Sequence, residues 1–391
     1  MPWKETCAMD ERVRFVGEAL ADEETMTALC SYYGISRTTG YKWLARYRAL
    51  GPLGLKERAW TPHRPGLARP AEMVAAVVRL KKRFKLYGPK KLRVKLREAQ
   101  PDWVVPAAST IGEWLKRADL VGERVRRRCC PPYEQPFGAV TASNDVWSVD
   151  FKGWFRTGDG ARCDPLTVSD AYSRYALVCR SVEAPDYDHV RPRFEAAFCE
   201  FGLPGALRSD NGPPFASIGA GGLSRLSVWW IKLGVKAERI EPGQPQQNGR
   251  HERLHRTLKQ ATARPPAPTL RAQQARFERF RREYNEVRPH EALGQKTPAS
   301  LYLASSRPYP CRLREPEYDG ESAVRRVRSN GEIKWAGELI FVSEVLAGEP
   351  VGITETAGGD WRVCYANIEL GYIERRTHRL TRRLRVRADP P

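Results

Sequence analysis

The segment Asp145-Val-Trp-Ser-Val-Asp150-Phe decides the fold, because its apolar residues predict a β-strand into which a carboxylate is set. Burying a carboxylate between Val149 and Phe151 is costly unless the group faces a site or a partner. Two more strands are expected at 165–169 and 175–182, and the short turn 170–174 between them predicts a hairpin. The region therefore begins as a sheet with an acid in its first strand.

The chain beyond this hairpin alternates helices and strands. An amphipathic helix is expected at 188–201, and short strands are expected at 206–209 and 236–240. Two helices follow, at 249–261 and 270–285, and the second carries Phe277, Phe280 and Tyr284 at helical spacing. This order predicts an α/β sheet with helices packed on its faces.

Three acidic residues stand out in this region. Asp150 lies in the first strand, Asp210 follows the strand at 206–209, and Glu252 lies near the start of a helix. Ligands of α/β sheets bind at such strand ends, so three acids on separate elements can converge on one point. Carboxylate oxygens favour Mg²⁺ or Mn²⁺ over zinc. Two such ions, about 4 Å apart, would serve phosphoryl transfer by activating the attacking oxygen and stabilising the leaving one.

The composition indicates a polyanionic partner. The 391 residues include 66 Lys and Arg against 46 Asp and Glu, a net charge of +20. A surplus of this size favours nucleic acid, with an anionic membrane surface as the alternative. No apolar run reaches the ~18 residues that span a bilayer, so we expect no membrane partner and a cytoplasmic, nucleoid-associated protein. The nine cysteines form no C-x-x-C pair, which favours buried thiols over disulfides or a zinc site.

The sequence around the three acids resembles a known family. The blocks are Trp147-Ser-Val-Asp150-Phe, Arg208-Ser-Asp210-Asn-Gly and Pro245-Gln-Gln-Asn-Gly-Arg-His-Glu252-Arg-Leu-His-Arg-Thr-Leu-Lys259. Together they are similar to the integrase core of bacterial insertion-sequence transposases, relatives of retroviral integrases. The resemblance covers residues 144–303 and includes Tyr284-Asn285 and Arg288-Pro289-His290. It implies a ribonuclease-H-like fold with Asp150, Asp210 and Glu252 as a DDE triad.

The spacing of the triad departs from the family pattern at one place. Asp210 and Glu252 are 252 − 210 = 42 positions apart, which is longer than the integrase pattern, and the Gly-rich stretch 217–227 accounts for the excess as an inserted surface loop. The family also implies that basic residues one and two turns after the glutamate contact the DNA end. These are Arg256 and Lys259, which share a helical face with Glu252.

A second motif overlaps Glu252. His251-Glu252-Arg253-Leu254-His255 matches the H-E-x-x-H pattern of zinc metallopeptidases, in which two histidines on one helical face bind zinc and the glutamate is the general base. Glu278 or Glu283 would supply a third ligand. This alternative leaves Asp150 and Asp210 unexplained. Otherwise His251 and His255 are expected to be DNA-facing or surface residues beside the triad.

The first 56 residues predict a helix-turn-helix. Helices are expected at 11–20, 25–33 and 37–50, with Ser36 capping the third. This third helix would place Tyr41, Leu44, Tyr47 and Leu50 toward a core. Its polar side would then enter the major groove of DNA, the alternative being a solvated basic face on an ordinary helical hairpin. The residues expected to contact DNA are Arg37, Thr38, Thr39, Lys42 and Arg46.

The flanking regions complete a multidomain α/β architecture. Helices at 71–86, 90–99 and 110–118, the last capped by Ser109, predict a second helical unit, and short strands from 324 to 373 predict a small β-barrel. The expected divisions are a helix-turn-helix domain at 1–56, a linker at 57–70, a second helix-turn-helix-like domain at 71–119, a basic linker at 120–143, the integrase core at 144–305, a linker at 306–320, the barrel at 321–375 and a basic tail at 376–391.

The sequence thus predicts a DNA transposase. Its N-terminal domain would bind the terminal repeats of a mobile element, and its core would free a 3′-hydroxyl that attacks a target phosphodiester with the help of two Mg²⁺ or Mn²⁺ ions. Both element ends and the target are double-stranded DNA, so we expect a homo-oligomer on DNA. The remaining alternative is a catalytically silent DNA-binding regulator.

Overall fold

The computed structural model describes residues 7–57, 71–122, 140–241 and 245–381, and it forms two units, Met1–Ala71 and Glu72–Pro391. Most of the basic linker expected at 120–143, and the tail beyond residue 381, lie outside the described residues. No described helix is both long and apolar enough to cross a membrane.

The first unit is a three-helix bundle. Helices α1 (Ala8–Ala21), α2 (Met26–Tyr32) and α3 (Arg37–Leu50) are followed by the 3₁₀ turn η1 (Gly51–Leu55). The Ser36 hydroxyl accepts a hydrogen bond from the Thr39 N–H at 3.2 Å, so it caps α3 as predicted. The buried core consists of Phe15, Val16, Leu29, Cys30, Trp43, Leu44 and Leu55.

One side of α3 differs from the prediction. Trp43 and Leu44 are buried, whereas Tyr41 is 57% exposed and Leu50 is 50% exposed. Gly40 explains this orientation, because a Cβ atom there would lie 2.6 Å from the Cys30 sulfur. Helix α3 therefore presses its Gly40 backbone against α2, and Tyr41 stands beside the basic residues on the outer face.

The second unit begins with another helical trio, α4 (Ala71–Arg83), α5 (Pro89–Ala99) and α6 (Ala108–Arg117). Its core is formed by apolar residues of all three helices, among them Val77, Leu92 and Ile111. The predicted cap at Ser109 is wrong: α6 begins at Ala108, after an extended Ala107 that makes no side-chain cap. Alanine is the strongest helix former, so the helix extends back over Ala108 and takes in Ser109.

The central sheet has the predicted α/β topology. Strands β1 (Val146–Phe151), β3 (Arg162–Asp170) and β4 (Ala176–Val182) are antiparallel, and β5 (Ala206–Ser209) and β6 (Lys236–Arg239) run parallel to β1. The short β2 (Phe155–Arg156) pairs with the start of β3. The order β4-β3-β1-β5-β6 is the arrangement expected of a ribonuclease-H-like core.

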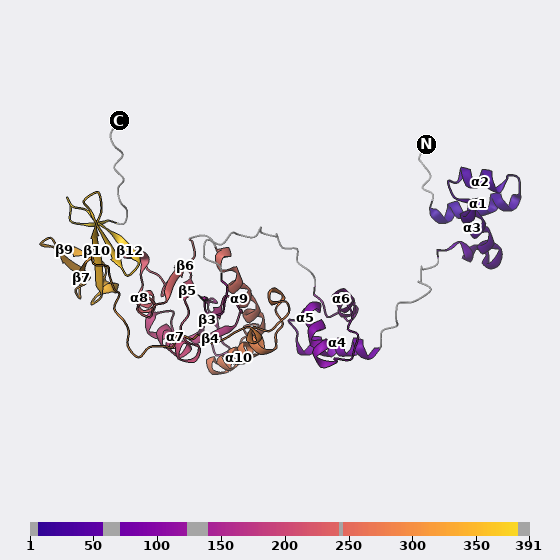
Figure 1. Ribbon diagram of the computed structural model, residues 1–391. Coiled ribbons are helices and arrows are strands. Elements are labelled where there is room, and N and C mark those ends of the chain that lie inside the picture. The colour runs from indigo at the N-terminus through magenta and orange to yellow at the C-terminus, as the bar shows by residue number, and fades with distance from the viewer. Residues whose placement is uncertain (1–6, 58–70, 123–139, 242–244, 382–391) are drawn as a thin grey trace, which may run out of the picture. The chain divides into compact units, whose positions relative to one another are not determined.

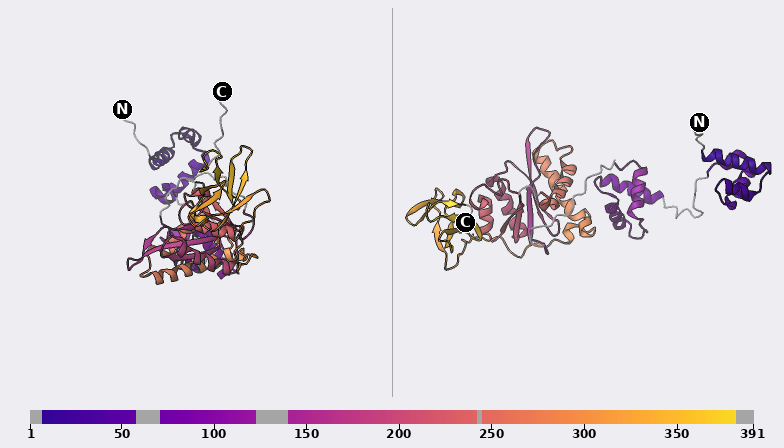
Figure 2. Two further views of the ribbon diagram at one scale, coloured as in Figure 1. Left: turned by 90° about the vertical axis from the view of Figure 1, so that its left-hand side faces the viewer. Right: turned by 90° about the horizontal axis from the view of Figure 1, so that it is seen from above.

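Two pairs of helices cover the two faces of this sheet (Figures 1 and 2). Helices α7 (Tyr187–Phe201) and α8 (Arg225–Lys232) share a core with Trp147 and Val149. Helices α9 (Gly249–Thr262) and α10 (Leu270–Arg282) pack on the opposite face with Cys163 and Cys179. Side chains alternate along a strand, so Ser148 and Asp150 point toward the α9 face.

The C-terminal region is not the predicted closed barrel. Strands β7 (Ala323–Arg326), β10 (Pro350–Glu355), β11 (Trp361–Tyr365), β12 (Ile368–Ile373) and β13 (Leu380–Thr381) form an open antiparallel sheet in the order β13-β12-β11-β10-β7. Strands β8 (Glu332–Trp335) and β9 (Glu338–Phe341) pair only with each other, through a tight turn at 336–337. The edge strands β7 and β13 have no pairing with one another, so within the described residues nothing closes the sheet.

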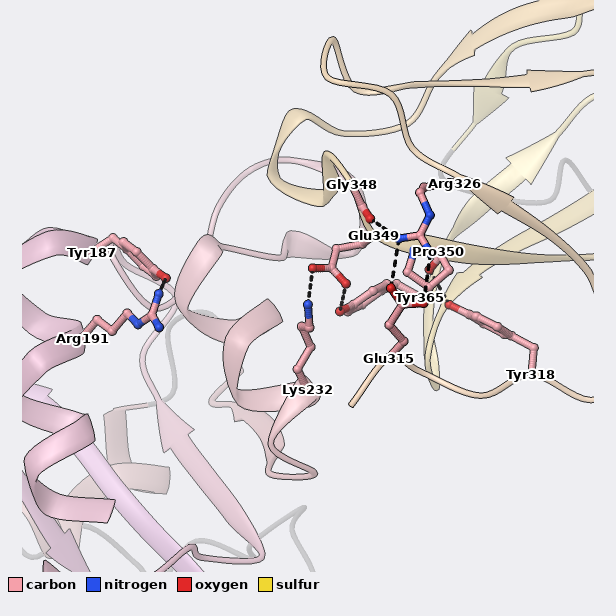
Figure 3. Close-up of polar contacts among 10 residues, drawn as sticks. All are labelled: Tyr187, Arg191, Lys232, Glu315, Tyr318, Arg326, Gly348, Glu349, Pro350 and Tyr365. Carbon is pink, nitrogen blue, oxygen red and sulfur yellow. Dashed lines mark hydrogen bonds and ion pairs between the residues drawn. The ribbon is translucent and has the colours of Figure 1, made fainter. Parts of the chain in front are cut away.

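The sheet packs instead on helix α8 and the Gly-rich stretch before it. Ala220, Leu223 and Val228 join its apolar core. The Lys232 ammonium lies 2.6 Å from a Glu349 carboxylate oxygen, whose other oxygen accepts a hydrogen bond from Tyr365, as Figure 3 shows. The insertion at 217–227, expected to be a surface loop, therefore forms part of the surface on which the C-terminal sheet is seated.

Candidate active site

The pairing of β1 with β5 brings two of the three acids together. Ser148 pairs with Arg208 in a parallel register, and continuing that register by two residues places Asp150 beside Asp210. Asp210 directly follows β5, and its Oδ1 accepts a hydrogen bond from the Gly212 N–H at 3.2 Å. The turn after β5 is tied to β6 as well, because the Asn211 amide donates to the Ile240 carbonyl at 2.6 Å.

Asp150 interacts electrostatically with both of the other acids. Burial and the negative charges of Asp210 and Glu252 raise the pKa of Asp150 to about 7. Two like charges beside a buried carboxylate oppose its ionisation, and a cation placed among them would remove that penalty. The three carboxylates are therefore an electrostatic cluster, although they come from three separate elements.

Helix α9 is attached to the sheet by two buried histidines. The Thr167 hydroxyl lies 2.7 Å from His251 Nε2 and 2.7 Å from His255 Nε2, and it donates to the Asp150 carbonyl at 3.0 Å. A threonine hydroxyl has one proton and two lone pairs. Because the hydroxyl proton is donated to the backbone carbonyl oxygen of Asp150, both imidazoles must donate from Nε2 to the threonine oxygen. The network therefore assigns both histidines as neutral Nε2–H tautomers. Burial agrees with this, since it lowers the pKa of His251 to about 3 and that of His255 to about 2.

We call this group the histidine–threonine cluster; it consists of Thr167, Ser169, His251 and His255. The Ser169 hydroxyl lies 2.9 Å from His251 Nδ1, and His255 Nδ1 lies 3.7 Å from Asp150 Oδ2. The cluster fixes the inward face of α9 against β3 and against the strand that carries Asp150. Glu252, on the outward side of the same turn, is exposed.

These contacts disagree with both expectations for the histidines. His251 is 1% exposed and His255 is 8% exposed, so they are not surface residues that face DNA. They are engaged by threonine and serine hydroxyls, and this argues against the zinc-peptidase alternative. Among the described residues, no group of three or more His, Cys, Asp or Glu side chains is arranged to hold a metal ion. The H-E-x-x-H residues therefore do not form a metal site, and the carboxylates of Asp150, Asp210 and Glu252 do not form a complete one either.

Most of the residues expected to contact DNA are exposed, and they lie on helices α3 and α9. Arg256 and Lys259 are exposed on α9, on the side that carries Glu252. Lys259 lines a cavity of about 220 Å³ together with Lys152, two residues after Asp150. Arg37, Thr38 and Lys42 are exposed on α3, while Thr39 and Arg46 are half-buried, Arg46 lying over the Trp43 ring at 5.1 Å.

The segment after α10 has a structural role that the sequence did not reveal. Asn285 makes two hydrogen bonds to the backbone of Ala176, which fastens the end of α10 to β4. The Arg288 guanidinium lies 5.2 Å from the ring centroid of Tyr87, and Lys90 forms an ion pair with Glu291. The segment 284–291 therefore supports the core and contacts the helical trio α4–α6.

Sequence comparisons agree with this architecture. The family described as "Integrase core domain" matches residues 140–245 and, in a second form, residues 233–298. The family described as "Helix-turn-helix domain" matches residues 11–66. The matched ranges coincide with the central sheet and its helices, and with the α1–α3 bundle.

Two curated relatives come from bacterial insertion elements. The chain is 29% identical over 272 residues to the "Insertion element IS476 uncharacterized 39.2 kDa protein" of Xanthomonas euvesicatoria, covering 68% of this chain and 75% of that protein. It is 30% identical over 188 residues to the "Insertion element IS407 uncharacterized 31.7 kDa protein" of Burkholderia multivorans, covering 48% of this chain and 65% of the relative, slightly under two thirds.

Among solved structures, one match is the HTLV-2 integrase catalytic core domain in complex with magnesium. It is 15% identical, with a TM-score of 0.34, over 41% of this chain and 98% of that domain. The similarity of this chain to known proteins rests on its sequence matches to the two families and to the insertion-element proteins.

Proposed function

The chain belongs with the bacterial insertion-sequence transposases that have an integrase core, and from this premise we propose that Asp150, Asp210 and Glu252 form its DNA-cleaving and DNA-joining site. The observation that carries the proposal is the register of β1 against β5, which sets Asp150 beside Asp210. The inclusion of Glu252 is supported by His255, three residues later on α9, whose Nδ1 lies 3.7 Å from Asp150 Oδ2.

The donor set fits a pair of divalent cations. Three carboxylates offer only hard oxygen ligands, which suit Mg²⁺ or Mn²⁺. Burial first, and then the negative charges of Asp210 and Glu252, raise the pKa of Asp150, and a bound cation would favour its ionised form. When bound, such ions supply charge neutralisation at the reacting phosphate. The proposal requires the exposed Glu252 side chain to turn toward the two aspartates, while His251 and His255 keep α9 on the sheet.

The chain's own residues would align the DNA. Phosphoryl transfer of this class depends on positioning and charge stabilisation rather than on a covalent protein intermediate. Arg256 and Lys259 lie one and two turns after Glu252, so a phosphate backbone that reaches the acids would pass over them. The histidine–threonine cluster keeps α9 in register with β1 and β3, which holds these cations and Glu252 at fixed spacing.

The remaining domains would recognise and gather the DNA. We propose that residues 1–56 read the terminal repeats of the element with the exposed face of α3, and that the α4–α6 unit, at 71–119, and the basic residues of the C-terminal region add contacts. Joining two element ends to one target needs at least two active sites, so we propose a homo-oligomer assembled on DNA, at the nucleoid in the cytoplasm.

The proposed contacts between α3 and DNA are tested by measuring how DNA affinity depends on salt concentration. Each phosphate contact that is lost lowers the slope of log affinity against log salt by about one unit. Arg37→Ala and Lys42→Ala should weaken binding to terminal-repeat DNA, while Arg14→Ala, also exposed but on α1, should leave it unchanged. Unaltered footprints for both α3 variants would refute the assignment of this face.

The catalytic part is tested by strand transfer on terminal-repeat DNA with Mg²⁺ or Mn²⁺. Asp150→Asn, Asp210→Asn and Glu252→Gln should each abolish joining while DNA binding persists, and Glu286→Gln, an exposed carboxylate elsewhere in the domain, should behave as wild type. A silent regulator would bind DNA and cut nothing with either metal. A peptidase would cleave peptides in a zinc- and His255-dependent way.

A further inference from the structure

An exposed tryptophan stands next to the candidate active site. Trp154 follows β1 by three residues and is 55% exposed. Its neighbour Phe155 points the other way and packs edge-on against Phe277 under α10. Because side chains alternate along extended chain, burying Phe155 turns the Trp154 indole outward. Gly153, with φ of +81°, makes the bend that precedes it.

The indole is held in place by two arginines. The Arg162 guanidinium lies 5.2 Å from its ring centroid and is itself fixed by two hydrogen bonds to Asp164. The Arg156 guanidinium lies 5.8 Å from the centroid and donates to the Gly160 carbonyl. Cation–π contacts of this kind orient an aromatic ring without burying it. More than half of the tryptophan therefore stays open to solvent in a defined position.

Trp154 also lines a cavity that includes Lys152, two residues after Asp150, and Lys259, seven residues after Glu252. This cavity, of about 220 Å³, is bounded by Lys152, Gly153, Trp154, Phe155, Lys259 and Ala263. In the part of the chain that the structure describes, neither Lys152 nor Lys259 has a carboxylate oxygen within ion-pair distance, although Lys152 interacts electrostatically with both Asp150 and Lys259. The cavity thus combines a flat aromatic wall with two neighbouring cations.

We propose that this cavity is a nucleotide-binding site for the unpaired last nucleotide of a DNA end, with its base stacked on Trp154 and its phosphate between Lys152 and Lys259. An aromatic ring beside a cationic groove is the combination that binds single-stranded nucleic acid, and every base offers a face for stacking. A base inside a duplex has no free face, whereas an opened end does. The inference rests on the proposed function for its substrate, since the site lies two residues from Asp150.

The experiment uses the full chain and a blunt duplex with 2-aminopurine at its last position, in EDTA so that nothing is cut. Wild type should change the fluorescence of the terminal label and not that of a label in the middle of the duplex. Trp154→Ala should lose this signal and bind a frayed end about 5- to 150-fold more weakly. Trp154→Phe should retain most of both. Tyr172→Ala, which removes another exposed aromatic of the same domain, should match wild type.

The outcomes separate this inference from the proposed function. A terminal signal that survives Trp154→Ala in a variant with unchanged thermal unfolding overturns the nucleotide site, as does a signal that is absent in wild type or equal at the internal label. If the signal depends on Trp154 but wild type joins no DNA with either metal, the nucleotide site stands and the catalytic proposal fails. If wild type joins DNA but the terminal signal does not depend on Trp154, the catalytic proposal stands and the nucleotide site fails.

Discussion

Replacing Thr167 by valine tests the histidine–threonine cluster directly. Valine keeps the shape of threonine but removes the hydroxyl to which His251 and His255 both donate. Two buried N–H groups would lose their acceptor at once. A buried donor left without a partner costs about 1–3 kcal/mol. His251 keeps its bond to Ser169, and a small shift of α9 would rehydrate part of the site, so we expect a loss of about 2–4 kcal/mol in total.

Thr167→Ser is the matched control, because it keeps the hydroxyl and removes one methyl group. Its expected cost is about 1 kcal/mol. Urea unfolding gives the global loss, and hydrogen exchange of α9 amides, followed by mass spectrometry, shows where it falls. Valine should speed exchange in α9 far more than serine does, with α7 unaffected.

The same pair of variants should separate catalysis from binding. We expect Thr167→Val to lower strand joining more than it lowers DNA affinity, because α9 carries Glu252, and Thr167→Ser to restore joining. Two results would refute the reasoning: a valine variant as stable as wild type, or a serine variant as impaired as the valine one.

Three further predictions concern other parts of the chain. Gly40→Ala should lower the melting temperature of the isolated residues 1–57 by several degrees, because the new Cβ would overlap the packed side chains of α2; an unchanged melting curve would contradict that packing. Lys232→Met should make the C-terminal sheet susceptible to limited proteolysis near residue 320, because it leaves the Glu349 carboxylate, which is 16% exposed, with only the Tyr365 hydrogen bond. A chain that combines Lys232→Met with Glu349→Gln should recover the resistance of the wild type. Stability in EDTA should fall as pH drops from 6.5 to 4. His251 and His255 have pKa values lowered to about 3 and 2, so the unfolded chain takes up their protons first. Asp150, with its pKa raised to about 7, works in the opposite direction and offsets one of the two histidines. The net slope for these groups is about 1.4 kcal/mol per pH unit, and a flat urea midpoint between pH 6.5 and 4 would contradict it.

Periodic patterns predicted the sheet and most helices, but they missed helix α8. Its residues face two cores: Trp229 and Trp230 pack under the central sheet, whereas Val228 packs under the C-terminal sheet. The helix has only eight residues, Arg225–Lys232, fewer than the roughly 11 or more over which a helical period can be recognised. The Gly-rich stretch before it strengthened the impression of a loop.

The closed barrel failed for a related reason. Alternating short strands indicate pairing between neighbours, but they do not indicate whether the first and last strands of a sheet meet. Here one face of the sheet is covered by α8 and by the segment around Ala220 and Leu223, so burial of the apolar face is achieved without closure.

The three candidate acids could be proposed from sequence because each sits at a strand end or a helix start inside a distinctive block, and their catalytic role stays a prediction. The contacts that organise them could not be proposed in this way. Thr167 lies 84 positions from His251, and no local spacing reports such a pairing. The same two histidines gave the zinc alternative, and only their contacts with hydroxyls on β3 show a different role. The exposure of Trp154 could not be predicted from sequence either, because it depends on which of the two neighbouring aromatic residues, Trp154 or Phe155, packs against the core.

Crystals of the chain with a DNA end and Mn²⁺ would test the central claim most directly, through the anomalous scattering of manganese. The account predicts two manganese peaks bounded by the carboxylates of Asp150, Asp210 and Glu252, with the Glu252 side chain turned toward the two aspartates, and no peak in the Asp150→Asn chain. Manganese bound elsewhere, or peaks that persist unchanged in that variant, would contradict it.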